Sequence, residues 1–209
     1  MYKMKSLKFI HITKCAGSFI EDIGIKNIIR WGKYHREYGY WHEIFINKPL
    51  KLKMKYDWFV IVRNPYDRIL SEYYCKWAGI GKKSHKEKSL WELFFETNYV
   101  HNKEQFNKFL INKIKNRKVR GDHYTEQYKY IDNNCNITII KFENLNQELS
   151  VLFNKYLINI DIYKYPKINS STINDKLFTI DDFNDELIKC INDVYDKDFI
   201  MFNYTKKII

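Results

Sequence analysis

Short runs of apolar residues alternate along this chain with segments in which apolar positions recur at helical spacing. The runs at 7–12, 57–62 and 136–142 are almost uninterrupted, which predicts buried strands. Helical spacing follows at 18 onward, 65–77, 103–116, 145–157 and 182–199. Strands that alternate with helices indicate an α/β fold. We expect a P-loop-like, three-layer domain with a central parallel β-sheet flanked by helices.

Two local signals mark where helices begin after the first two strands. Ser18 followed by Glu21 has the pattern of a capping box, so a helix should begin at Ser18. Asn64 is a suitable N-cap, and Pro65 is favoured at the first helical position. Between the first helix and the second strand, the stretch from 30 to 56 is mostly aromatic and polar. It is predicted to be a long loop, of the kind that is often functional in a compact domain.

The turn after the first strand has the chemistry of an anion site. The backbone N–H groups of Gly17, Ser18 and Phe19 would open the following helix, where the helix dipole favours negative charge. Lys14 adds a positive side chain beside them. The turn is not a Walker A loop, because its lysine precedes its single glycine. From these residues alone, an ordinary strand–helix turn with a surface lysine remains an alternative.

The turn after the second strand offers a second set of phosphate-binding groups. Arg63 ends the strand, and Ser71 lies two turns into the next helix. A guanidinium binds phosphate with paired hydrogen bonds, and a hydroxyl can donate to the same group. The alternative is a local ion pair between Arg63 and Asp67, with Ser71 facing solvent.

Composition narrows the class of protein without identifying a substrate. Hydrophobic residues make up 45% of the 209 residues, too many for a disordered chain, so a single domain over 1–209 is expected. The net charge of +11 favours an anionic partner, but the basic residues are scattered. The four cysteines form no CxxC pair, which argues against a zinc knuckle. The apolar segment at 7–12 is too short to span a membrane, and we expect a soluble, cytoplasmic protein of undetermined oligomeric state.

Both turns resemble motifs of the sulfotransferases that use 3′-phosphoadenosine 5′-phosphosulfate (PAPS), especially the carbohydrate branch. Residues 9–18, FIHITKCAGS, look like the 5′-phosphosulfate loop HIPKTGGTS. Residues 62–73, VRNPYDRILSEY, are very similar to the 3′-phosphate motif VRNPYDRLVSAY. The similarity continues in order through 126–131, 141–145, 169–171 and 195–204. This sequence departs from the loop pattern at Thr13, Cys15 and Ala16, although the lysine is retained.

The resemblance implies a function and a role for individual residues. The protein would transfer a sulfuryl group from PAPS to a hydroxyl acceptor, most simply a carbohydrate, releasing adenosine 3′,5′-bisphosphate and using no metal. Lys14 would stabilise the charge that develops on the bridging oxygen. The residues implied to bind the nucleotide are Lys14, Ala16, Gly17, Ser18, Phe19, Arg63, Ser71, Lys167, Ser170 and Ser171.

The base that deprotonates the acceptor is expected between the two motifs. His42 is our first choice, because a histidine titrates near neutral pH, with Glu43 as its orienting partner or substitute and His35 as a further alternative. Two other functions compete with sulfuryl transfer. A P-loop-like nucleotide kinase would use the same sheet, and a non-catalytic protein could bind nucleic acid or anionic glycan through its charge. We expect no nucleic-acid partner.

Overall fold

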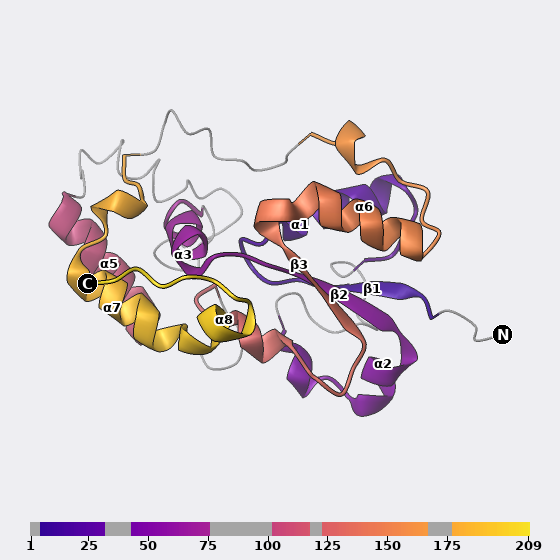
Figure 1. The fold of residues 1–209 in the computed structure, drawn as a ribbon, viewed down its shortest axis with the longest axis horizontal. Helices are drawn as coiled ribbons and strands as arrows, with labels where there is room; N and C mark the ends of the chain where they lie inside the picture. The colour runs from indigo at the N-terminus through magenta and orange to yellow at the C-terminus, as the bar shows by residue number, and fades with distance from the viewer. Residues whose placement is uncertain (1–4, 32–42, 76–101, 118–122, 167–176) are drawn as a thin grey trace, which may run out of the picture. The chain divides into compact units, whose positions relative to one another are not determined.

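The computed structural model describes residues 5–31, 43–75, 102–117, 123–166 and 177–209. Three of its strands form a parallel sheet in the order β1-β2-β3 (Figure 1), with β1 at Leu7–Ile10, β2 at Asp57–Val62 and β3 at Ile137–Lys141. Phe9 is in register with Phe59, and Val60 with Ile139. The three apolar runs therefore form the predicted strands, and the predicted α/β class with a parallel sheet is confirmed.

Helices cover both faces of this sheet, which gives three layers. The helices α1 (Gly17–Lys26) and α6 (Leu145–Lys155) lie over one face, and α2 (Leu50–Lys55) lies on the other (Figure 1). On the first face, Trp31 stacks on Phe153 and meets the Phe59 ring edge-on. On the second face, Trp58 packs against Phe45. Every position of β2 is buried, which explains why its sequence after Asp57 is continuously apolar rather than alternating.

The described residues divide into two compact units. The first unit holds 5–31, 43–63 and 127–166 and contains the sheet. The second unit holds 64–75, 102–117, 123–126 and 177–209 and is helical. The chain passes between the units several times. That residues 1–209 behave as one domain stays a prediction.

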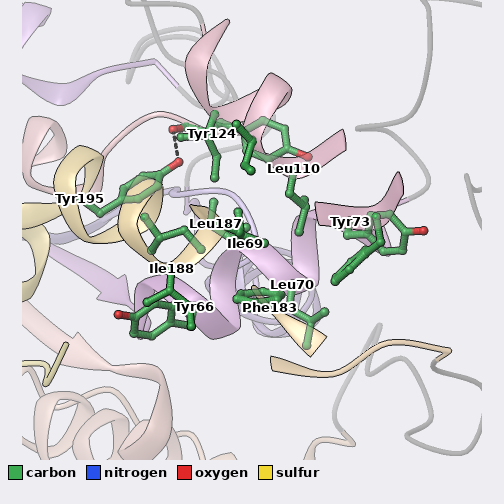
Figure 2. Close-up of a cluster of buried hydrophobic side chains, with 14 of the residues drawn as sticks. Tyr66, Ile69, Leu70, Tyr73, Leu110, Tyr124, Phe183, Leu187, Ile188 and Tyr195 are labelled. Carbon is green, nitrogen blue, oxygen red and sulfur yellow. Dashed lines mark hydrogen bonds between the residues drawn. The ribbon is translucent and has the colours of Figure 1, made fainter. Parts of the chain in front are cut away.

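The second unit is built around a cluster of aromatic and aliphatic side chains (Figure 2). Its helices are α3 (Pro65–Tyr73), α5 (Lys103–Lys115), α7 (Asp185–Val194) and α8 (Asp196–Met201). The helix predicted at 182–199 is in fact two helices that meet at Tyr195. This tyrosine is fully buried, and its hydroxyl donates to the Tyr124 carbonyl oxygen at 2.8 Å (Figure 2).

Two other local predictions require correction. The stretch 30–56 is not simply a loop, because it contains α2 and the short 3-10 helix η2 (Phe45–Asn47). The first helix begins at Gly17, and its N-cap is Ala16 rather than Ser18. The N-cap residue makes no side-chain capping bond, and Glu21 bonds to His11. In contrast, Asn64 caps α3 through a bond from the Tyr66 N–H, as predicted.

The remaining short helices are 3-10 turns that connect the larger elements. They are η3 (Gln127–Tyr130), η4 (Phe142–Asn144), η5 (Ile162–Lys164) and η7 (Ile180–Asp182). Among the helices that the structure describes, none combines the length and the apolar character needed to cross a bilayer.

Candidate nucleotide-binding site

The turn between β1 and α1 has an unusual backbone. Lys14 and Ala16 both adopt positive φ angles, 58° and 59°, which are rare for residues other than glycine. Ala16 is left-handed, with ψ 17°, and the helix begins at the next residue. A left-handed residue followed by helical residues turns successive N–H groups toward one point and forms an anion-binding concavity. Backbone strain of this kind is typical of ligand-binding turns.

Gly17 is required at the start of α1 by a close approach to His11. A Cβ atom on Gly17 would overlap the His11 imidazole, with Nε2 as the nearest atom. The ring cannot easily move away, because its Nδ1 is 2.8 Å from Oε1 of the buried Glu21. The glycine therefore allows the helix N-terminus and the histidine to share this space.

The first backbone N–H groups of α1 differ in whether they already donate a hydrogen bond within the helix. The Phe19 N–H donates to the Ala16 carbonyl oxygen at 3.0 Å, as does the Ile20 N–H at 3.1 Å. Gly17 and Ser18 are consequently better candidates than Phe19 for binding an anion through the backbone. The first turn of α1 holds no acidic residue, which favours an anion at this end of the helix.

Arg63 lies beside this turn, at the end of β2. Its Nη1 donates to the Lys14 carbonyl oxygen at 3.4 Å, and its guanidinium carbon is 4.3 Å from the centroid of the Phe142 ring. Phe142 begins η4, directly after β3. The carboxyl ends of all three strands thus supply part of the site, as expected for an open parallel sheet. The structure brings together the two residues, Lys14 and Arg63, that the sequence assigned to separate motifs.

Gln127 connects the same two turns, a role that the sequence analysis did not assign. Its Oε1 accepts a bond from the Arg63 N–H at 2.9 Å and one from Cys15 Sγ at 3.3 Å. Its Nε2 donates to the Arg63 carbonyl oxygen at 2.8 Å. Gln127 is fully buried, and Cys15 is almost fully buried. The only signal in the sequence was the position of this glutamine, three residues before the pair Tyr130 and Ile131, and that signal did not reveal its partners.

The other predicted residues are distributed differently. Ser71 is partly buried on α3 and belongs to the second unit. Glu43 is paired with Lys48, with 2.8 Å between Oε2 and Nζ. Five predicted residues lie outside the described part of the chain, namely His35, His42, Lys167, Ser170 and Ser171.

A hollow of about 420 Å³ lies between α6 and β3. It is lined by residues such as Ile139, Val151 and Lys155, and none of the predicted nucleotide-binding residues that the structure describes contributes to it. The candidate site is therefore defined by the two turns and their bonds rather than by this hollow.

Comparison with known proteins gives one match. Residues 3–205 match the sequence model of a family described as the sulfotransferase family. Neither the curated proteins nor the solved structures gave a match. The family match covers nearly the whole chain, including both units.

Proposed function

We propose, since the chain belongs to the sulfotransferase family, that its donor is PAPS and its acceptor is a carbohydrate hydroxyl. Sulfuryl transfer is the activity of the family. The choice of donor rests on the two phosphate-binding turns, and the choice of acceptor rests on the basic surplus of +11 together with the resemblance in the motifs.

The turn at 13–19 supports binding of the 5′-phosphosulfate. The backbone amides of Gly17 and Ser18 would bind the phosphate at the positive end of α1. Ala16 contributes through its left-handed backbone, and the Phe19 amide completes the first turn. Lys14 would contact the oxygen that bridges sulfur and phosphorus, where negative charge accumulates as the bond breaks.

Arg63 and Ser71 would bind the 3′-phosphate. The Phe142 ring and the Lys14 carbonyl hold the guanidinium in place, which lowers the entropy lost when a phosphate binds. Lys167, Ser170 and Ser171 would close over the nucleotide. Their assignment rests on the resemblance alone.

The reaction we propose is an in-line displacement. The acceptor oxygen forms a bond to sulfur while the bond from sulfur to the bridging oxygen breaks, and adenosine 3′,5′-bisphosphate leaves. His42 would accept the proton of the acceptor hydroxyl. Glu43 would orient this histidine or take its place, with His35 as a further alternative. The Glu43 carboxylate already forms an ion pair with Lys48, with 2.8 Å between Oε2 and Nζ. Positioning and electrostatics would supply most of the acceleration, without a metal.

One observation carries the proposal: the Arg63 guanidinium donates to the backbone of Lys14. Two motifs that are 49 residues apart in the chain thereby meet within the first unit. Each motif alone suits an ordinary strand–helix turn, whereas their meeting supports a single anion site at one edge of the sheet, to which Lys14 and Arg63 would both contribute positive charge.

The direct test combines calorimetry with a transfer assay. Adenosine 3′,5′-bisphosphate should bind to the purified protein, and radiolabelled PAPS should transfer label to at least one member of a panel of oligosaccharides. Binding of ATP without affinity for the bisphosphate would instead support the kinase alternative. Binding only to long polyanions, with steep salt dependence, would support the non-catalytic alternative.

The base is tested separately from the donor. His42→Ala should lower turnover with little change in affinity for adenosine 3′,5′-bisphosphate. Glu43→Gln and His35→Ala serve as parallel variants. Normal turnover in His42→Ala would assign the base to whichever of these two variants loses activity.

A further inference from the structure

Three side chains with metal-binding groups meet in the second unit, apart from the residues assigned to the nucleotide. They are Glu72 in the last turn of α3, Cys75 three residues later, and His123. One carboxylate oxygen, the thiol sulfur and one ring nitrogen all lie within 4.8 Å of one another. His123 Nδ1 and Glu72 Oε2 are 2.7 Å apart.

We propose that Glu72, Cys75 and His123 form a zinc-binding site with three protein ligands and a fourth position for water. Thiolate, imidazole and carboxylate are the three side-chain ligands that Zn²⁺ accepts, and a set of three that leaves one position open is common. The spacing of three residues places Glu72 and Cys75 on the same side of the chain at the end of α3. Thus two ligands come from one element and the third from another.

The third ligand is held in place by buried groups. Arg68, one turn before Glu72 on α3, donates from Nη2 to the His123 carbonyl oxygen and from Nη1 to that of Thr125, both at 2.9 Å. The Tyr195 hydroxyl donates to the intervening Tyr124 carbonyl oxygen at 2.8 Å. Three consecutive carbonyls are therefore fixed, which orients His123 before any ion binds. Such support around the ligands is characteristic of working metal sites.

Burial and charge also favour a cation at this cluster. Glu72 is fully buried and Cys75 is 5% exposed, whereas the His123 side chain is 27% exposed. The Glu72 carboxylate is paired with His123, and a divalent cation would replace this pairing while also balancing a Cys75 thiolate. The exposed side of His123 gives an ion and its water ligand a route from solvent.

The geometry requires a small adjustment when the ion enters. In a tetrahedral site, a bound nitrogen and a bound oxygen are roughly 3.4 Å apart, given zinc bonds of about 2.1 Å. The present separation of 2.7 Å between His123 and Glu72 is that of a hydrogen bond. A side-chain rotation that opens this pair by roughly 0.7 Å, well within the range of a glutamate, would replace the hydrogen bond with two metal bonds. The proton of that hydrogen bond and the proton of the Cys75 thiol would be released to solvent as the ion binds.

The bound ion would join the end of α3 to the segment 123–126. Both segments belong to the second unit, so the effect would be on the stability of that unit. The three ligands are brought together only in the folded chain, so Zn²⁺ would bind the folded state more tightly than the unfolded state. Its binding should therefore raise the melting temperature. None of the residues assigned to the nucleotide takes part, so the zinc proposal stands or falls independently of the proposed function.

The test is zinc binding by the full chain, with any affinity tag removed. After treatment with a chelator and dialysis, the wild-type protein should take up one equivalent of Zn²⁺ and melt at a higher temperature. Cys75→Ser and His123→Gln should lose both effects. Cys190→Ser is the matched control, because Cys190 lies on α7, away from the cluster, and it should behave as the wild type.

Cobalt gives a second measurement that does not depend on the variants folding. Co²⁺ bound to the wild-type protein should show the near-ultraviolet charge-transfer absorption of a single thiolate ligand and the visible bands of tetrahedral coordination. Failure of the wild type to take up zinc would overturn the proposal and leave the cluster as a hydrogen-bonded group. Cobalt uptake without the thiolate band, or zinc uptake that survives Cys75→Ser, would also overturn it.

Discussion

The side-chain amide of Gln127 bonds to both backbone groups of Arg63, accepting from the N–H at 2.9 Å and donating to the carbonyl oxygen at 2.8 Å. The same Oε1 accepts from Cys15 in the first turn. One glutamine therefore holds the end of β2 and the loop before α1 in a fixed relation. The bonds reach the backbone of Arg63, so its guanidinium remains available to a ligand.

Removing this amide should destabilise the first unit. Gln127→Leu keeps the size of the side chain but leaves the partly buried N–H and carbonyl of Arg63 without this partner, which should cost about 2 to 4 kcal/mol. Urea unfolding measures this loss. Gln147→Leu makes the same change at an exposed position of α6 and should have little effect. Equal stability of the two variants would contradict the role assigned to Gln127.

The Arg63 side chain can be altered without disturbing these backbone bonds. Arg63→Gln should leave the urea midpoint nearly unchanged, because its polar contact with Lys14 is long, at 3.4 Å. Its affinity for adenosine 3′,5′-bisphosphate should fall by at least tenfold, since a charge-assisted bond to phosphate contributes about 1.5 to 3 kcal/mol. Calorimetry measures the affinity. A large loss of stability with unchanged affinity would show that the guanidinium is structural.

Lys14 should affect turnover more than nucleotide binding. Lys14→Met retains the length of the side chain and its apolar stem but removes the charge. We expect the turnover number to fall by roughly 10²- to 10³-fold, the cost of losing a group that stabilises developing charge. Lys14→Arg is the matched charged control. A Lys14→Met variant that transfers sulfate normally would exclude the lysine from the reaction.

Ala16 carries a backbone conformation that suits glycine better. A left-handed residue with a Cβ costs about 1 to 2 kcal/mol, whereas the added freedom of glycine in the unfolded chain costs about 0.4 to 1 kcal/mol. Ala16→Gly should therefore stabilise the protein by about 0.5 to 1 kcal/mol without weakening nucleotide binding. Thermal unfolding tests this expectation. Gly17→Ala, one residue later, should destabilise instead, because its Cβ would overlap His11.

An ion pair between Lys53 and Asp132 should make stability depend on acidity. The atoms Nζ and Oδ2 are 2.6 Å apart, and both side chains are nearly buried. Hydrogen bonds from Lys53 and from the backbone of Asn134 lower the pKa of Asp132. The folded chain thus favours the carboxylate, and this stabilisation is present above the ordinary carboxyl pKa of about 3.9 and is lost as the pH falls through the lowered value.

Asp132→Asn tests this dependence. At neutral pH the variant should be less stable than the wild type by roughly 2 to 3 kcal/mol, because Lys53 loses its counter-charge. The difference should shrink as the pH falls into the acid range, where the wild-type carboxyl is also neutral. Urea midpoints measured against pH give both quantities. A difference that stays constant with pH would mean that the charge on Asp132 does not contribute.

Much of the fold could be predicted from local patterns, because strands and helices depend on residues close together in the chain. The three apolar runs became β1, β2 and β3, and the cap at Asn64 was confirmed. The cap predicted at Ser18 was wrong, because the helix begins one residue earlier with Ala16 as its N-cap, and Glu21 bonds to His11, ten residues earlier. The helix α2 was missed because its six residues are mostly lysine and leucine, without a clear apolar face.

The sequence by itself determined the class of protein and the parallel sheet, and it predicted Lys14 and Arg63 as the two cations that would bind phosphate. Only the tertiary structure decided what those cations touch: Arg63 contacts Lys14 and Phe142, and Gln127 joins Arg63 to Cys15. The physical reason is distance along the chain. These partners are separated by 49 to 112 residues. Hydrophobic patterning specifies that a residue is buried, but folding alone selects the residue it meets.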